Sequence, residues 1–185
     1  AISTKDGAKD NACIVNTVTQ LTDNPKRVTV AVNNSNLTAE TIKKTGVFNV
    51  SVLTESTPFD LIKDLGFVSG RDHDKLSGRS DVARTANGLT YLTGNTNAVL
   101  SAKVISAEDY GTHTLFTAEV TAAEILSDAP SLTYAYYYEH IKPKPSVIEE
   151  KKTGWICKVC GYVYEGEELP ADFICPLCKH GAEDF

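Results

Sequence analysis

Hydrophobic and polar residues alternate with a period of two along much of the first 141 residues, and this pattern predicts strands. The alternating segments are 27–32, 47–52, 98–106 and 112–125. Short alternating strands separated by turn residues are typical of antiparallel sheets, so we expect a sandwich or barrel in this part of the chain. The tyrosine-rich segment 134–138 is expected to form a final strand, because tyrosine is enriched in strands.

Two short helices are expected to interrupt the strands. One has Thr57 as N-cap and Pro58 in its first turn, and Gly66 provides the stop. The other begins at about Thr38, also a plausible N-cap, and ends at Gly46, which suits the left-handed position after a helix. The pattern therefore predicts a mainly β body with two helices.

The chain of 185 residues has room for one domain and a small appendage. Residues 142–153 contain two prolines and no apolar periodicity, so we interpret them as a linker. This linker separates a body, residues 1–141, from a tail, residues 154–185. A tail of 32 residues buries too little apolar surface to fold without a metal or disulfides.

The charge balance argues against two classes of partner. With 24 acidic and 18 basic residues the formal net charge is −6, which disfavours binding to nucleic acid and to anionic membranes. No apolar run approaches the roughly 18 residues of a membrane span, and residues 1–10 contain no signal-peptide core. We therefore expect a cytoplasmic protein. Because the chain contains no methionine, we also expect that a segment precedes Ala1.

Four of the five cysteines fall within 22 residues, with the spacing Cys-x2-Cys-x14-Cys-x2-Cys. They are Cys157, Cys160, Cys175 and Cys178. Two such knuckles can place four thiolates at the corners of a tetrahedron, and without a secretory signal they indicate a metal site instead of disulfides. Zinc and a single iron both fit, and the bare pattern favours a zinc ribbon. Cys13 is interpreted as an inert hydrophobic residue.

The residues around the four cysteines resemble rubredoxin. The matching motifs are WICKVCGYVY at 155–164 and FICPLC at 173–178. The loop between the knuckles is short, as in the domain that ends rubrerythrins, and Lys179 stands where a glycine often follows the last cysteine. The resemblance implies a mononuclear iron held by the four cysteines. Trp155, Tyr162, Tyr164 and Phe173 are expected to keep water away from that iron.

The body resembles the flavin reductase-like family. The matching segments are 16–25, 32–38, 46–53, 69–75 and 111–120. The resemblance implies a split β-barrel that binds FMN noncovalently and forms a homodimer, without the helix and strand that normally begin the family domain. It also implies that His113 lies near the reactive face of the flavin, as the candidate catalytic residue. Without the resemblance, a surface turn histidine is an equally good interpretation.

Polar residues of the body are expected to hold FMN. The stretch 33–36 opens the short helix, where N–H groups, hydroxyls and the helix dipole suit a phosphate. In isolation, such a stretch is more often a turn with an ordinary cap. Arg71 and Lys75 either add charge to the phosphate or pair with Asp72 and Asp74. The complete set of expected FMN-binding residues is Asn16, Thr17, Val18, Thr19, Gln20, Asn33, Asn34, Ser35, Asn36, Thr38, Arg71 and Lys75.

The two parts together resemble the fusion family called high-molecular-weight rubredoxins. The resemblance implies that electrons pass from NAD(P)H through FMN to an iron held by four cysteines. The final acceptor would be a flavodiiron protein or another enzyme that removes oxygen or peroxide. Two alternatives stay open: a noncatalytic zinc-ribbon binding module on a β scaffold, and a flavin relay that is reduced by another protein instead of NAD(P)H.

Overall fold

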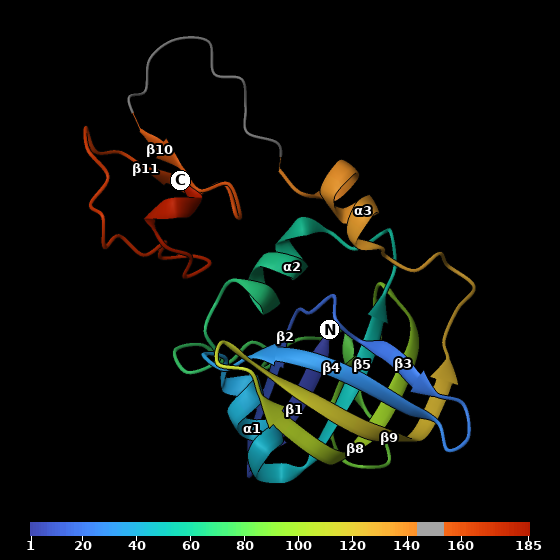
Figure 1. Cartoon of the computed structure of the whole chain (residues 1–185). Coiled ribbons are helices and arrows are strands. Elements are labelled where there is room, and N and C mark those ends of the chain that lie inside the picture. Colours follow the sequence, from blue (N-terminus) through green and yellow to red (C-terminus); the bar gives the residue numbers. More distant parts are fainter. Residues whose placement is uncertain (144–153) are drawn as a thin grey trace. The chain divides into compact units, whose positions relative to one another are not determined.

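The computed structural model describes residues 1–143 and 154–185, which form two compact units, residues 1–140 and 141–185 (Figure 1). Most of the predicted linker 142–153 lies outside the described residues. Within the two described ranges, no helix has both the length and the apolar character needed to cross a membrane.

The first unit is built on one seven-stranded sheet in which every neighbouring pair is antiparallel, in the order β2-β1-β5-β8-β9-β4-β3. Its strands are β1 (Ile2–Asp6), β2 (Lys9–Cys13), β3 (Thr19–Thr22), β4 (Arg27–Asn33), β5 (Val47–Leu53), β8 (Thr96–Asp109) and β9 (His113–Ile125). A separate hairpin consists of β6 (Val82–Arg84) and β7 (Thr90–Leu92). The four segments predicted from alternation correspond to β4, β5, β8 and β9, so the mainly β fold is confirmed.

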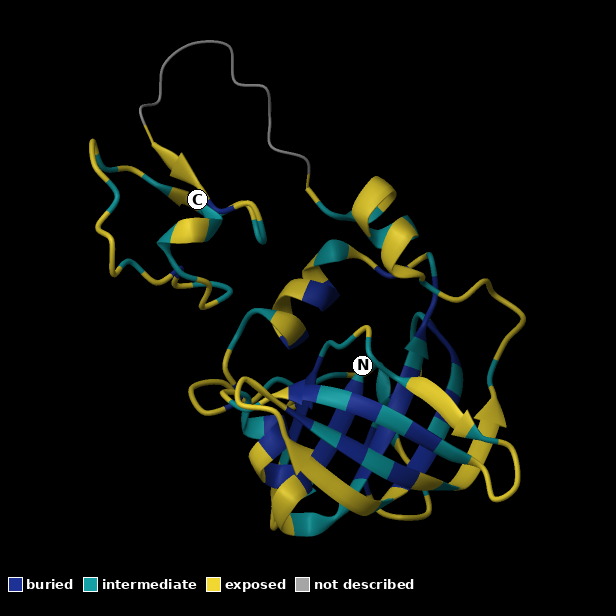
Figure 2. Cartoon of the chain, viewed as in Figure 1, coloured by how far each residue is buried: buried dark blue, intermediate teal, exposed yellow. Residues whose placement is uncertain are grey.

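The alternation of side chains along the strands places one face of the sheet on a continuous hydrophobic core (Figure 2). Val30 of β4, Phe48 of β5 and Phe116 of β9 are fully buried there, and helix α1 (Leu37–Thr45) adds Ile42. A second cluster includes Leu65 of helix α2 (Phe59–Gly66). The sheet is strongly curved around the first cluster (Figure 1). Its closure into a split barrel stays a prediction.

Both predicted helices exist, but each begins at a different residue. The N-cap of α1 is Asn36, because Thr38 lies further in, with a buried hydroxyl that accepts a hydrogen bond from Asn11 Nδ2 at 2.8 Å. The N-cap of α2 is Pro58, because the hydroxyl of Thr57 donates to the carbonyl of the preceding turn at 2.7 Å. These hydroxyls serve tertiary contacts and do not cap the helices.

The predicted stop residue is correct for α1 and one residue early for α2. Gly46 has φ of 70° directly after α1, as expected for a left-handed C-cap, and its N–H donates to the Ile42 carbonyl at 2.8 Å. Gly66 is instead the last residue of α2, and Phe67 provides a right-handed C-cap. A glycine can therefore end a helix without adopting positive φ.

The prediction of a strand at 134–138 was wrong, because this segment is helical. Helix α3 (Tyr134–Tyr136) is followed by a π-helical turn, Tyr137–Ile141. The hydroxyl oxygen of Thr133 accepts the N–H of Tyr136 at 3.1 Å and so caps the segment. The ring of Tyr134 lies 6.1 Å from that of Tyr137 and 6.5 Å from that of Tyr138, at helical spacing. The β preference of tyrosine depends on a pleated, half-buried surface, which is missing here.

The hairpin formed by β1 and β2 was not predicted. Its buried positions include the polar residues Ser3, Thr4 and Asn11, so the hydrophobic alternation that marks a strand is absent. Gly7 allows the tight turn, with φ of 58°. Burial of polar side chains therefore hid this element from a pattern based on hydrophobicity.

The second unit contains little regular structure. Strands β10 (Trp155–Ile156) and β11 (Val163–Tyr164) form a short antiparallel ladder, and a 3-10 turn spans Ala182–Asp184. The remaining described residues of this unit are mostly turns that carry the cysteines.

Candidate functional site

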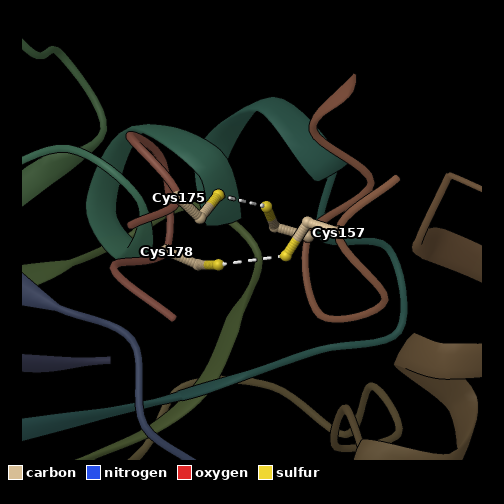
Figure 3. A group of neighbouring side chains, drawn as sticks. Cys157, Cys175 and Cys178 are labelled. Carbon is tan, nitrogen blue, oxygen red and sulfur yellow. Dashed lines mark hydrogen bonds between the residues drawn. The ribbon is translucent and has the colours of Figure 1, made fainter. Parts of the chain in front are cut away.

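The four predicted metal ligands converge in the second unit. The sulfur atoms of Cys157, Cys160, Cys175 and Cys178 all lie within 4.8 Å of one another. Two sulfur contacts cross between the knuckles, Cys157 with Cys178 and Cys160 with Cys175, both at 3.5 Å (Figure 3). A tetrahedral ion with metal–sulfur bonds of about 2.3 Å needs sulfur–sulfur edges of about 3.8 Å. The donor set therefore fits one tetrahedral metal ion.

The two knuckles have nearly the same backbone geometry. The N–H of Gly161 donates to the carbonyl of Cys157 at 2.8 Å, and the N–H of Lys179 donates to the carbonyl of Cys175 at 2.9 Å. Both donors have positive φ, 79° for Gly161 and 63° for Lys179. Lys179 thus occupies a left-handed position that glycine adopts with less strain.

Two of the four thiols resist ionisation in the absence of a cation. Burial raises the pKa of Cys160 to about 11 and also raises the pKa of Cys178. Only the thiolate form binds a metal, so uptake of the ion must release protons. Occupancy of the site is therefore expected to fall as the pH falls.

An aromatic cluster lies in the same unit. The ring of Phe173 lies 4.7 Å from Tyr164, 5.2 Å from Phe185 and 6.4 Å from Tyr162. Three of the four residues predicted to shield the metal are thus together, while Trp155 is 42% exposed. Sequence reasoning did not include Phe185, because its distance from the cysteine motifs gives no sign that the C-terminal end folds back.

In the first unit, the loop before α1 has the features of an anion site. The side chain of its N-cap, Asn36, makes no capping hydrogen bond to any described residue. Asn33 Oδ1 accepts from the N–H and hydroxyl of Ser35, both at 2.8 Å, and Arg71 donates to the Ser35 carbonyl at 2.9 Å and to Glu40 at 2.8 Å. A helix N-terminus without a side-chain cap and beside a guanidinium favours a negatively charged group.

Two predicted phosphate ligands make hydrogen bonds to other segments of the unit. Lys75 Nζ donates to the carbonyl of Ala12 at 2.9 Å and to that of Leu65 at 2.8 Å, and not to the aspartates of its own loop. Burial lowers the pKa of Lys75. The hydroxyl of Thr38 is buried against Asn11. Both side chains are thus engaged in the interior of the unit.

The segment predicted to contact the flavin ring lies along β3 at one edge of the sheet. Thr17 donates to the Ala31 carbonyl at 2.7 Å, which fixes the approach to β3. The side chain of Val18 is partly buried and packs against the core. Asn16, Thr19 and Gln20 are exposed.

His113 lies at the end of the neighbouring strand pair. It is the register partner of Asn33, so the candidate catalytic histidine lies across from the loop at 33–36. Its Nδ1 is 3.0 Å from the hydroxyl of Thr112. Asn34 binds the turn that leads to His113, donating to the Gly111 carbonyl at 2.7 Å. The structure therefore groups the loop with His113 at one end of β4 and β9.

A pocket of about 430 Å³ opens beside the start of α1. Its lining residues are Asp6, Lys9, Asn11, Leu37, Glu40, Thr41, Lys44 and Arg71. Asn11 Oδ1 is buried and has no hydrogen-bond partner in the described parts of the chain. Sequence reasoning missed Asn11, because only the folded hairpin brings it to this pocket. An orphaned acceptor next to Arg71 suits a polar ligand.

The families predicted from the motifs are confirmed by comparison with known proteins. Residues 1–144 match the flavin reductase like domain family, and residues 155–185 match the rubrerythrin, rubredoxin-like domain family. The first match covers well over half of the chain.

Individual proteins are similar either to the whole chain or to about two thirds of it. The chain is similar to high molecular weight rubredoxin of Moorella thermoacetica. The two are 35% identical over an alignment 212 residues long, which covers 100% of this chain and 92% of that protein. It is 41% identical over 125 residues to ferric-chelate reductase (NAD(P)H) of Archaeoglobus fulgidus, covering 68% of this chain and 73% of that protein. The structure of flavoredoxin from Methanosarcina acetivorans has a TM-score of 0.60 and 26% identity, covering 67% of this chain and 66% of that one.

Proposed function

The chain belongs to the flavin reductase-like domain family and ends in a rubredoxin-like domain, and from this premise we propose that it carries electrons from NAD(P)H to a one-electron acceptor. The observation that carries the proposal is a four-sulfur site on the same chain as a flavin reductase-like unit. When bound, FMN would exchange two electrons or one, and an iron held by four thiolates would exchange one.

The first unit would bind and orient FMN. The uncapped start of α1 and the guanidinium of Arg71 support an assignment of the phosphate to the loop 33–36. The exposed part of segment 16–20 would contact the flavin ring through backbone and amide groups. His113 would lie beside the ring, since it pairs with Asn33 at the end of the same strands.

The second unit would hold iron. Cys157, Cys160, Cys175 and Cys178 supply the four thiolates, and the aromatic cluster around Phe173 would limit the access of water. The same sulfur geometry accepts zinc, so the preference for iron rests on the rubredoxin-like family and on the reductase unit.

The wider setting is also part of the proposal. We place the protein in the cytoplasm as a homodimer, with a flavodiiron protein or another oxygen- or peroxide-removing enzyme as acceptor. The net charge of −6 supports a protein partner over nucleic acid.

The test is a visible spectrum and a metal analysis of purified protein, followed by anaerobic titration with NADH and NADPH. We expect bands of both flavin and iron–thiolate, both bleached by the pyridine nucleotide. Replacement of all four cysteines by serine should remove only the iron bands. A colourless protein with one zinc per chain, produced with iron in excess, would favour the zinc-ribbon alternative.

A second acceptor is favoured by one observation, the 41% identity to ferric-chelate reductase (NAD(P)H). The flavin unit could pass electrons directly to a ferric chelate without using the cysteines. Ferric citrate reduction by the four-serine variant separates the two routes: an unchanged rate supports direct transfer, and a lost rate places the iron site on the path.

A further inference from the structure

Asn34 is the centre of a hydrogen-bond network at the end of β4. Its Nδ2 donates to the two carboxylate oxygens of Asp109 at 3.1 and 3.2 Å and to the carbonyl of Gly111 at 2.7 Å. Its Oδ1 accepts from the hydroxyl of Thr114 at 2.5 Å and from Nζ of Lys43 at 3.4 Å. One side chain therefore joins helix α1 and both ends of the β8–β9 turn.

These contacts use the hydrogen-bonding capacity of the amide. A carboxamide has two N–H donors and two acceptor lone pairs, and here Asp109 and Gly111 take the donors while Thr114 and Lys43 take the acceptor. No donor is left for a phosphate oxygen. This distinguishes Asn34 from Asn36, whose side chain makes no capping hydrogen bond to a described residue.

The network holds His113 from both sides. The backbone N–H of Asn34 donates to the carbonyl of Thr112 at 2.9 Å, and its side chain binds the hydroxyl of Thr114. His113 lies between these two residues. Its backbone pairs with Asn33, and its carbonyl accepts the N–H of Tyr110 at 2.8 Å, but its ring is exposed and, among the described residues, its polar contact is the Thr112 hydroxyl. Asn34 therefore adds contacts to the residue on each side of a histidine whose backbone is already part of the β4–β9 ladder.

The turn itself needs such a clamp. Gly111 adopts φ of 84°, and its N–H donates to Asp109 Oδ1 at 2.8 Å. Lys43 forms an ion pair of 3.4 Å with Asp109, but both side chains are largely exposed, so this pair alone contributes little. Thr114 is buried, and loss of its acceptor would leave a desolvated hydroxyl.

We propose that Asn34 is a positioning residue that fixes His113 beside the flavin site, and that it is not a ligand of the FMN phosphate. The proposal rests on the proposed function of the first unit. It assigns to the amide a role in the rate of flavin reduction and none in FMN affinity.

The sharpest variant is Asn34→Asp, which keeps the shape and the acceptor for Thr114. It removes the donors to Asp109 and Gly111 and places two carboxylates against each other. The double variant Asn34→Asp/Asp109→Asn restores one donor–acceptor pair, because the introduced amide can donate to the introduced carboxylate. Lys43 can still bind that carboxylate. The control is Asn24→Asp, which adds the same charge on the exposed β3–β4 turn, at the far end of β4.

The redox readouts are the FMN dissociation constant and the rate of flavin reduction by NAD(P)H in stopped flow. We expect Asn34→Asp to slow reduction by about tenfold or more, while the FMN dissociation constant of the double variant, in which the total charge of the pair is unchanged, stays within about twofold. The double variant should recover most of the rate, and the control should match the unsubstituted protein. FMN binding weakened alike in the single and double variants would instead show that Asn34 holds the phosphate, and would overturn the proposal.

Amide hydrogen exchange of residues 110–114, measured in the full chain without flavin, tests whether Asn34 stabilises this turn. We expect about tenfold faster exchange in Asn34→Asp and recovery in the double variant. Equal exchange in all three proteins would overturn the proposal. If the unsubstituted protein fails to bind FMN, the proposed function is wrong, and the exchange pattern still confirms or refutes the clamp.

Discussion

At the scale of single residues, the second cysteine knuckle carries Lys179 at the position where the first has Gly161. Both residues have positive φ and donate the same knuckle hydrogen bond. A side chain in this left-handed region costs roughly 1–2 kcal/mol relative to the right-handed helix, whereas glycine adopts it freely. The metal unit therefore holds a small amount of strain in one of two equivalent turns.

The variant Lys179→Gly should relieve that strain. We expect the free energy of unfolding of the metal-loaded chain to rise by about 1 kcal/mol, seen as slower loss of iron to a chelator in urea. The matched change Gly161→Lys should accelerate iron loss. If both variants lose iron at the rate of the unsubstituted protein, the two turns tolerate positive φ without cost.

The buried hydroxyl of Thr38 supports a second prediction. Thr38→Val leaves Asn11 Nδ2 without its 2.8 Å partner inside the unit, so the free energy of unfolding should fall by about 1–2 kcal/mol. FMN affinity should change by less than about twofold, because this hydroxyl does not reach outward. Urea unfolding and FMN titration measure the two effects, and Thr38→Ser is the control that keeps the hydroxyl. A large loss of FMN affinity with normal stability would return Thr38 to the ligand set.

The residue scale also shows what a sequence can predict about a site. The spacing of the four cysteines predicted the group of sulfur atoms that the structure brings within 4.8 Å of one another, because both knuckles are local structures. Thr38 and Lys75 remain predicted phosphate ligands, but sequence could not show that their hydrogen bonds go to segments far away in the chain. Asn11 was missed for the same reason. Burial depends on tertiary contacts, which local patterns do not contain.

At the scale of elements, hydrophobic alternation found the central strands and failed at two places for different reasons. The β1–β2 hairpin buries Asn11 and other polar residues, so its pattern looks irregular. The segment at 134–138 has the composition of a strand, but no strand of the described residues pairs with it, and the hydroxyl of Thr133 caps a helix there. Composition predicts a strand correctly only where the fold provides a neighbouring strand or core for the segment to pack against.

The connection into the β6–β7 hairpin provides a prediction about pH. Arg79 donates two hydrogen bonds to Asp81, at 2.8 and 2.7 Å, and these lower the pKa of Asp81. A lowered carboxyl pKa stabilises the folded state above the ordinary value of about 3.9, and this contribution is lost as pH falls through the folded value.

We therefore expect Asp81→Asn to lower the urea midpoint at pH 7 and to have a smaller effect at pH 3. The exposed carboxylate variant Asp23→Asn is the control and should shift neither midpoint appreciably. An equal deficit of Asp81→Asn at both pH values would mean that Arg79 stabilises the hairpin by packing and not by charge.

At the scale of the whole molecule, two compact units on one chain set the kinetics of the proposed electron transfer. Covalent linkage replaces a bimolecular encounter by an intramolecular one with a fixed effective concentration. The observed rate of iron reduction in the intact protein should then be independent of protein concentration.

Stopped-flow measurement of iron reduction by excess NAD(P)H, over a wide range of protein concentration, checks this expectation. The flavin and iron bands can be followed in the same trace. A rate that rises in proportion to protein concentration would contradict transfer within one chain and indicate encounters between separate molecules. The control repeats the measurement at increasing salt concentration. Salt should slow iron reduction strongly only if the reaction depends on an encounter between charged surfaces of separate molecules.

The division of the whole molecule into a body and a tail was the easiest feature to predict. The cysteine cluster and the proline-containing segment at 142–153 indicate it from the sequence alone, and two families match the chain separately. The arrangement of polar residues within the body was harder, because Asn34 and Arg71 acquire their partners only when the sheet and α1 are assembled.

Two sulfur contacts of 3.5 Å join the two knuckles, and this arrangement has a consequence for oxidative damage. If a chelator removes the ion in air, Cys157 can be oxidised with Cys178 and Cys160 with Cys175, since each pair starts only 3.5 Å apart. The resulting disulfides would join the knuckles and exclude the ion. A bound ion thus protects the thiolates that hold it, and a thiol reductant should be needed before an oxidised chain can be reloaded.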